Sequence, residues 1–103
     1  MSNESQTYIK VDESLHQPPM YRIIFVNDDR TPFEYVTSSI MGHFKYTAIT
    51  ASNIAQEIHN KGEETVAILP FEIAEQKGVE ITTEARGHGF PLRVRLAPDE
   101  PIL

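Results

Sequence analysis

The sequence contains no cysteine, which excludes a disulfide-bonded scaffold and thiol-based catalysis. It also has no apolar run near the roughly 20 residues that a membrane-spanning helix needs, so we expect no membrane association. The first 17 residues are polar and lack the basic, apolar and small-residue order of a signal peptide. These absences fit a protein of a reducing compartment, and we expect it to be cytoplasmic.

Positive charge is scarce as well. Nine Lys and Arg residues stand against fifteen Asp and Glu residues, which gives a formal net charge of −6. The arginines are dispersed along the chain, and the backbone of a nucleic acid would repel such a surface. We therefore expect no nucleic-acid partner, whereas a cationic ligand or partner would be attracted.

What is present suits one small domain. Hydrophobic residues make up 40% of the 103 residues, which is normal for a soluble protein with a single core. Residues 1–17 show no hydrophobic periodicity and are expected to form a disordered N-terminal tail. The folded domain is expected at 18–103. Its first strand is predicted over 20–26, a run of β-branched and aromatic residues that Asn27-Asp28-Asp29 ends.

Two helices are predicted next. Thr31 fits the N-cap of the first helix, Pro32 fits its first position, and Glu34 would complete a capping box. Thr47 is expected to cap the second helix, and Gly62 is expected to end it in a left-handed conformation.

A strand over 65–69, a helix opened by Pro70 and a strand over 92–96 complete the predicted elements. The order is strand, helix, helix, strand, helix, strand. Strands this few and short need helices packed against them, so the expected class is α+β.

The loop after the first strand is the richest in chemistry. Its two adjacent carboxylates, Asp28 and Asp29, follow the amide of Asn27. One interpretation is a loop that binds a cation, either an ammonium group or a metal ion. The other is a solvated turn held by an Asx-type hydrogen bond. His59, near the end of the second helix, is either structural or a neutral imidazole that accepts a hydrogen bond beside this loop.

Two other classes of function stay open on the residues alone. One is a plain protein-interaction domain, and the other is a small metal-dependent hydrolase that uses Asp28, Asp29 and His59. The four histidines have no HxxxH spacing, and no EF-hand pattern is present. We therefore expect no metal and no cofactor.

The block from Pro18 to Val36 resembles the signature of the ClpS family, a PPxYKVILxNDDxTPMEFV-like run. The resemblance continues through His59, through residues 72–77 and through Pro91-Leu92, and it covers roughly 18–97. It implies a three-stranded antiparallel sheet packed against three helices. It also implies a non-enzymatic adaptor that binds the first residue of N-degron substrates, usually Leu, Phe, Tyr or Trp. Such adaptors deliver these substrates to ClpA or ClpC, the unfoldases of ClpP, in the bacterial cytoplasm or less commonly the plastid stroma.

The resemblance also assigns residues. Asn27, Asp28 and His59 match the positions that bind the α-ammonium group. The positions of the hydrophobic pocket are matched by Thr31, Pro32, Phe33, Val36, Ala55, Ile58 and Leu92. Glu72 and Lys77 match positions that contact the N-terminal domain of the unfoldase. Phe33 and Ala55 stand where the family usually has methionine, so we expect the accepted first residues to differ from the usual ones.

Overall fold

The computed structural model describes residues 18–100, so the expected tail at 1–17 lies outside the described residues. Along the chain the elements are β1 (Met20–Val26), α2 (Phe33–Phe44), α3 (Ala48–Lys61), β2 (Glu63–Pro70), α4 (Phe71–Gly87) and β3 (Arg93–Pro98). This is the predicted order, and it confirms the α+β class. No helix between residues 18 and 100 has the length and apolar character needed to cross a membrane.

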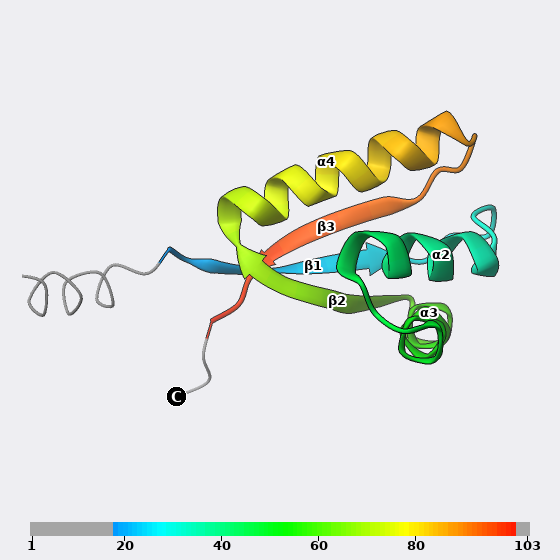
Figure 1. Ribbon diagram of the computed structural model, residues 1–103, viewed down its shortest axis with the longest axis horizontal. Helices are drawn as coiled ribbons and strands as arrows, with labels where there is room; N and C mark the ends of the chain where they lie inside the picture. The colour runs from blue at the N-terminus through cyan, green and yellow to red at the C-terminus, as the bar shows by residue number, and fades with distance from the viewer. Residues whose placement is uncertain (1–17, 101–103) are drawn as a thin grey trace, which may run out of the picture.

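The three strands form one antiparallel sheet in the order β2-β1-β3, as the resemblance implied (Figure 1). The central strand, β1, pairs with β2 from Met20↔Pro70 to Val26↔Glu63. Its other edge pairs with β3, where Val26 lies opposite Arg93. Pairing with the whole length of β1 makes β2 longer than the predicted 65–69.

One irregularity lies in the pairing of β1 with β2. Ile23 pairs with Ala67 but Ile24 pairs with Thr65, so Val66 is an extra residue that has no partner on β1. The carbonyl oxygen of Val66 accepts a hydrogen bond of 2.7 Å from the hydroxyl of Tyr46. This bond ties the connection between α2 and α3 to the sheet.

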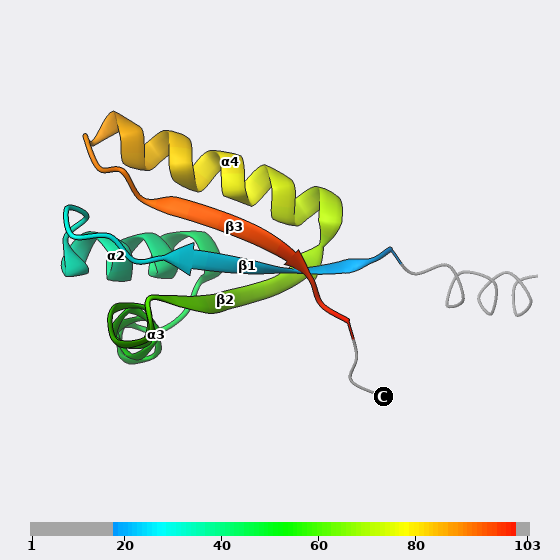
Figure 2. The same cartoon turned by 180° about the vertical axis from the view of Figure 1, so that it is seen from behind.

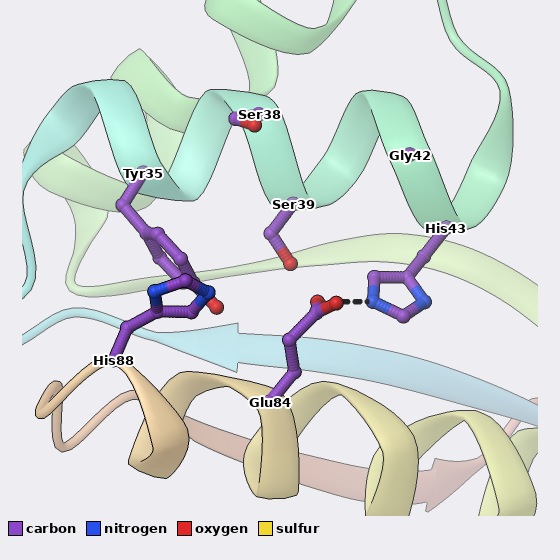
Figure 3. Close-up of a pocket in the computed structure, with 7 residues that line it drawn as sticks. All are labelled: Tyr35, Ser38, Ser39, Gly42, His43, Glu84 and His88. Atoms are coloured by element: carbon purple, nitrogen blue, oxygen red, sulfur yellow. Dashed lines mark hydrogen bonds and ion pairs between the residues drawn. The ribbon is translucent and has the colours of Figure 1, made fainter.

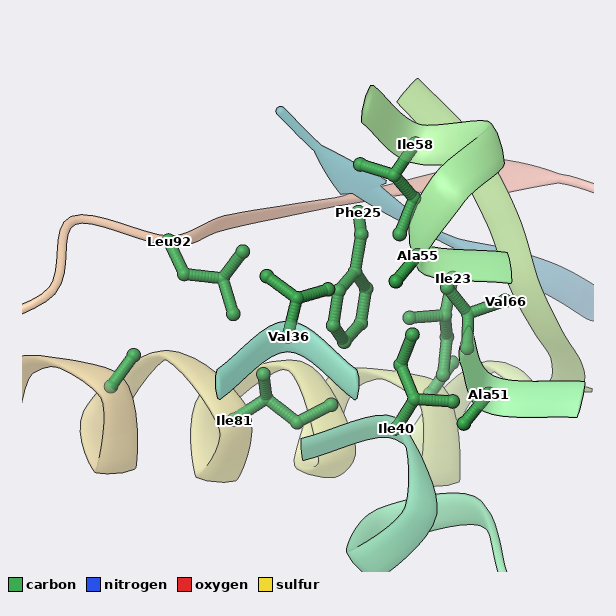
Figure 4. Packing of buried hydrophobic residues seen from close by; sticks show 12 residues of the cluster. Ile23, Phe25, Val36, Ile40, Ala51, Ala55, Ile58, Val66, Ile81 and Leu92 are labelled. Atoms are coloured by element: carbon green, nitrogen blue, oxygen red, sulfur yellow. The ribbon is translucent and has the colours of Figure 1, made fainter. Parts of the chain in front are cut away.

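The core lies between the sheet and the three helices, which pack on one of its faces (Figures 1 and 2). Ile23 and Phe25 alternate on β1 and are fully buried, and Figure 4 shows the Phe25 ring directed at Val36 of α2. The helices contribute Val36 and Ile40 from α2, Ala51, Ala55 and Ile58 from α3, and Ala74, Ile81 and Ala85 from α4.

The predicted start of α2 is wrong by one residue. The helix begins at Phe33 after Pro32, and no side-chain hydrogen bond caps it among the described residues. Pro32 takes the N-cap position because its carbonyl oxygen accepts the backbone N–H of Val36 at 3.1 Å. The hydroxyl and backbone N–H of Thr31 donate to the Asp28 carboxylate instead. By contrast, Thr47 Oγ1 caps α3 by accepting from Thr50 N at 3.2 Å, as predicted.

Candidate functional site

The loop between β1 and α2 is organised around one carboxylate. Asp28 Oδ1 accepts the backbone N–H of Arg30 at 2.8 Å and that of Thr31 at 2.7 Å. Asp28 Oδ2 accepts the Thr31 hydroxyl at 2.9 Å. These are the Asx-type hydrogen bonds of the turn interpretation. They fix the loop in a single shape and leave one acceptor lone pair, on Oδ2.

The same contacts keep this carboxylate ionised. Partial burial by itself would raise the pKa of Asp28, but the hydrogen bonds from Arg30 and Thr31, with the positive charge of Arg30, outweigh burial and lower the pKa. Asp28 is therefore an anion at neutral pH.

The end of α3 is attached to this loop. Gly62, with φ of 92°, ends the helix, and its carbonyl oxygen accepts the backbone N–H of Asn27 at 2.8 Å. His59 lies one turn before Gly62 on the same helix. The bond between Asn27 and Gly62 thus brings His59 next to a loop that is more than thirty residues away in the sequence.

A cavity of about 340 Å³ opens between the loop, α2 and α3. It is lined by Asn27, Asp28, Asp29, Thr31, Phe33, Val36, Ala55, Ile58 and His59. Ala55 and Ile58 are each only 2% exposed and belong to the core, so the apolar floor is built into the fold. Phe33 is 40% exposed and lies at the solvent edge. Oxygen and nitrogen acceptors therefore stand beside an apolar hollow.

The structure brings together most of the residues that the resemblance assigned. All three positions matched to α-ammonium binding line the cavity, and so do five of the seven matched to the pocket. The other two, Pro32 and Leu92, are not among its lining residues within 18–100: Pro32 is exposed at the start of α2, and Leu92 is buried in the core. Asp29 was not assigned to the ammonium site but lines the cavity, and its place next to Asp28 in the sequence was the available signal.

Glu72 and Lys77 lie elsewhere, on α4. Glu72 is exposed in the first turn of the helix. Lys77 Nζ lies 3.5 Å from Oε1 of Glu80. Both therefore belong to a surface separate from the cavity.

Across the described residues, no three His, Cys, Asp or Glu side chains are grouped so that they could hold a metal ion. The arrangement favours the binding of a small cation that carries an apolar group. The acceptors would take the hydrogen bonds of the cation, and the hollow would take the apolar group.

Comparisons with known proteins agree on one family. Residues 16–95 match the model of the family described as ATP-dependent Clp protease adaptor protein ClpS. A relative from Helicobacter hepaticus, the ATP-dependent Clp protease adapter protein ClpS, is 38% identical over 82% of this chain and 85% of its own length. The adapter protein ClpS 1 of Rhodopseudomonas palustris is 32% identical over 97% of this chain and all of its own.

A solved structure gives the same result in three dimensions. The structure of Agrobacterium tumefaciens ClpS2 bound to L-phenylalaninamide is similar to this one with a TM-score of 0.78 and 31% sequence identity. The similarity covers 81% of this chain and all of the other.

Proposed function

The chain belongs to the ClpS family of Clp protease adaptors, and on this premise we propose that it binds the first residue of N-degron substrates. In this proposal it hands those substrates to a ClpA- or ClpC-type unfoldase for degradation by ClpP. It acts as an adaptor and not as an enzyme, in the cytoplasm of a bacterium.

One observation carries the proposal: hydrogen-bond acceptors and an apolar floor share a single cavity. A protein's first residue differs from every other residue by its α-ammonium group, a compact cation with three donors. Asn27, Asp28 and His59 can accept from it, and Asp28 also provides a full negative charge. A charge-assisted hydrogen bond contributes about 1.5–3 kcal/mol net.

The apolar half of the cavity suits the side chain of that first residue. Val36, Ala55 and Ile58 form a buried floor that a large hydrophobic group would cover. Such burial stabilises by about 1.5–3 kcal/mol, and association entropy offsets part of both gains. The expected result is reversible, micromolar binding, which delivery requires. The related ClpS2 binds L-phenylalaninamide, a molecule with a free α-amino group and a benzyl side chain.

We assign delivery to α4. Glu72 and Lys77 would contact the N-terminal domain of the unfoldase, because both are on this helix and outside the cavity. In that arrangement the adaptor can hold a substrate and an unfoldase at the same time.

A titration of the chain with two peptides tests the proposal. One peptide begins with Phe, and the other is the same peptide with its N-terminus acetylated. Acetylation removes the positive charge and two donors, so it should abolish binding. Equal binding of both would favour a plain interaction domain, and metal-dependent turnover of the peptide would favour the hydrolase.

A further inference from the structure

A second polar face lies between α2 and α4, away from the first-residue cavity. Tyr35, Ser39 and His43 recur every four residues on α2 and so share one side of that helix. Glu84 on α4 and His88, the residue that caps the end of this helix, are spaced in the same way. Figure 3 shows the two sets directed at each other across the gap between the helices.

The gap holds a cavity of about 310 Å³, which is lined by Tyr35, Ser38, Ser39, Gly42, His43, Glu84 and His88. A water molecule occupies roughly 30 Å³ in the liquid, so the space is larger than a single bridging water needs. It reaches the lower end of the range of small-molecule sites. The absence of a side chain at Gly42 helps to keep the space open.

Two hydroxyl groups in this cavity have no partner. Ser39 is 6% exposed and Figure 3 shows its oxygen directed from α2 towards α4. Neither Ser39 Oγ nor Tyr35 Oη makes a hydrogen bond to any group in the part of the chain that the structure describes. Buried hydroxyls without partners are rare because each one has lost its hydrogen bonds to water. Both oxygens therefore have hydrogen-bonding capacity that the described residues leave unused.

The charge of the cavity comes from one carboxylate. Glu84 Oε1 is 2.9 Å from His43 Nε2, which leaves the second oxygen of Glu84 without that partner. Burial, together with the negative charge of Glu84, raises the pKa of Tyr35, so this hydroxyl keeps its proton. The lining includes no Lys or Arg. The cavity thus offers a negative charge and two hydroxyl oxygens, which are acceptors for a cation.

We propose that the cavity between α2 and α4 binds the guanidinium group of an arginine in a protein partner. A guanidinium has five donors spread over a plane, which suits acceptors that come from two helices. An ammonium concentrates its donors at one point. Aromatic residues also line the cavity: the Tyr35 and His88 rings lie against each other, with centroids 5.4 Å apart and planes tilted by 57°. An aromatic ring attracts a guanidinium more than it attracts a neutral group.

Charge complementarity points to a basic segment as the partner. The chain carries a net charge of −6, and α4 carries four glutamates, at 72, 75, 80 and 84, against two cations, Lys77 and Arg86. A segment with several basic residues would be attracted to this helix, and one arginine would enter the cavity. The inference does not depend on the first-residue cavity.

A pair of acetylated peptides tests it. Acetyl-Gly-Arg-Gly-amide is titrated into the full chain, and amide shifts are followed by NMR; the control peptide has citrulline, which is uncharged, in place of arginine. The acetyl group keeps both probes from presenting an α-ammonium. We expect the arginine peptide to shift the amides of Ser39, His43 and Glu84, and the citrulline peptide to bind at least tenfold more weakly, the usual effect of losing a charge-assisted hydrogen bond.

Variants place the binding in this cavity. Glu84→Gln should weaken the arginine peptide at least tenfold, whereas Glu80→Gln, the same change one turn away and outside the lining, should not. Ser39→Ala should weaken it by a smaller factor. The spectrum of each free variant reports whether its fold is retained. Equal shifts from the arginine and citrulline peptides, or equal losses in the two Glu variants, would overturn the proposal. If methylguanidinium binds as tightly as the arginine peptide, the rest of the peptide contributes nothing to recognition. That result would contradict the proposal that the ligand is an arginine of a protein partner.

Discussion

At the scale of the residue, Asp28 holds its loop through three hydrogen bonds. In Asp28→Asn the Thr31 hydroxyl loses a charged acceptor, so we expect about 1–2 kcal/mol less unfolding free energy at pH 7. The native pKa of Asp28 is lowered, so its stabilisation is present above the ordinary value of 3.8 and is lost as pH falls through the native pKa. Urea unfolding at pH 7 and pH 3 should therefore show a gap between the two proteins that shrinks in acid. A gap of the same size at both pH values would contradict this role.

His59 gives a prediction about binding. It lines the cavity and can accept a hydrogen bond from the α-ammonium. His59→Leu removes the acceptor and should lower the affinity for a peptide beginning with Phe by about tenfold, whereas His59→Gln keeps a neutral acceptor and should lower it less. Calorimetry on both variants checks this, and equal losses would mean that a different group accepts the bond.

Phe33 and Ala55 shape the cavity from opposite ends, one at the solvent edge and one at the floor. We expect the ranking of first residues to differ from the usual Leu, Phe, Tyr and Trp. Ala55→Met would fill part of the floor and lower the affinity for a Trp-first peptide most, by about tenfold. Adding Phe33→Met should restore the usual ranking. Calorimetry with peptides that vary only in the first residue checks this, and identical rankings in all three proteins would contradict it.

At the scale of the element, the end of α3 depends on Gly62. Its φ of 92° is costly for a residue with a side chain, so Gly62→Ala should lower the unfolding free energy by about 1 kcal/mol. Gly42→Ala is a matched control: a methyl group there meets nothing within 4 Å, and the position is helical, so it should stabilise by about 0.5–1 kcal/mol. Chemical denaturation of both variants would show effects of opposite sign. Effects of the same sign would mean that backbone conformation does not decide them.

The elements themselves could be predicted because their signals are local. The β-branched run of β1, the Thr47 cap and Gly62 each act within a few residues. The start of α2 was predicted one residue early, because Thr31 is held by the Asp28 carboxylate in the preceding loop, and the pattern around Pro32 does not show that contact. The central place of β1 depends on partners far along the chain. Pairing at that distance has no local signal.

The candidate site was predicted mainly through the family signature. The residues alone left open whether the loop after β1 is a turn or binds a cation, and Asp28 both forms the turn and lines the cavity. The cavity between α2 and α4 was not predicted. The residues that α2 contributes recur every four positions, which is a local pattern. Glu84, on the other side of the cavity, comes 41 residues after His43, and only the packing of the two helices brings them together.

At the scale of the whole molecule, the first-residue cavity and the Glu72 end of the proposed unfoldase surface lie at opposite ends of β1. The first-residue cavity begins at Asn27, just after this strand, whereas Glu72 follows Pro70, which pairs with Met20 at its start. Seven residues of strand separate these ends by roughly 20 Å. Substrate and unfoldase therefore need not compete for space.

That separation predicts independent effects. The double change Glu72→Ala and Lys77→Ala should leave affinity for a Phe-first peptide within about twofold, since distant sites usually act additively. Affinity for the N-terminal domain of the unfoldase should fall by at least tenfold. Both can be measured by calorimetry on the same protein preparation. A matching loss of peptide affinity would show that the surfaces are coupled.

The central place of β1 also bears on how the protein is made. This strand is synthesised before both of its partners, which follow at Glu63–Pro70 and Arg93–Pro98. Until then both edges of this hydrophobic strand have unpaired backbone N–H and C=O groups, and strands in that state are prone to aggregate. The sheet is completed only when nearly all of the described chain exists. A product truncated before Arg93 would lack β3 and would leave the edge of β1 that pairs with it exposed. Incomplete synthesis would therefore yield a fragment prone to aggregation.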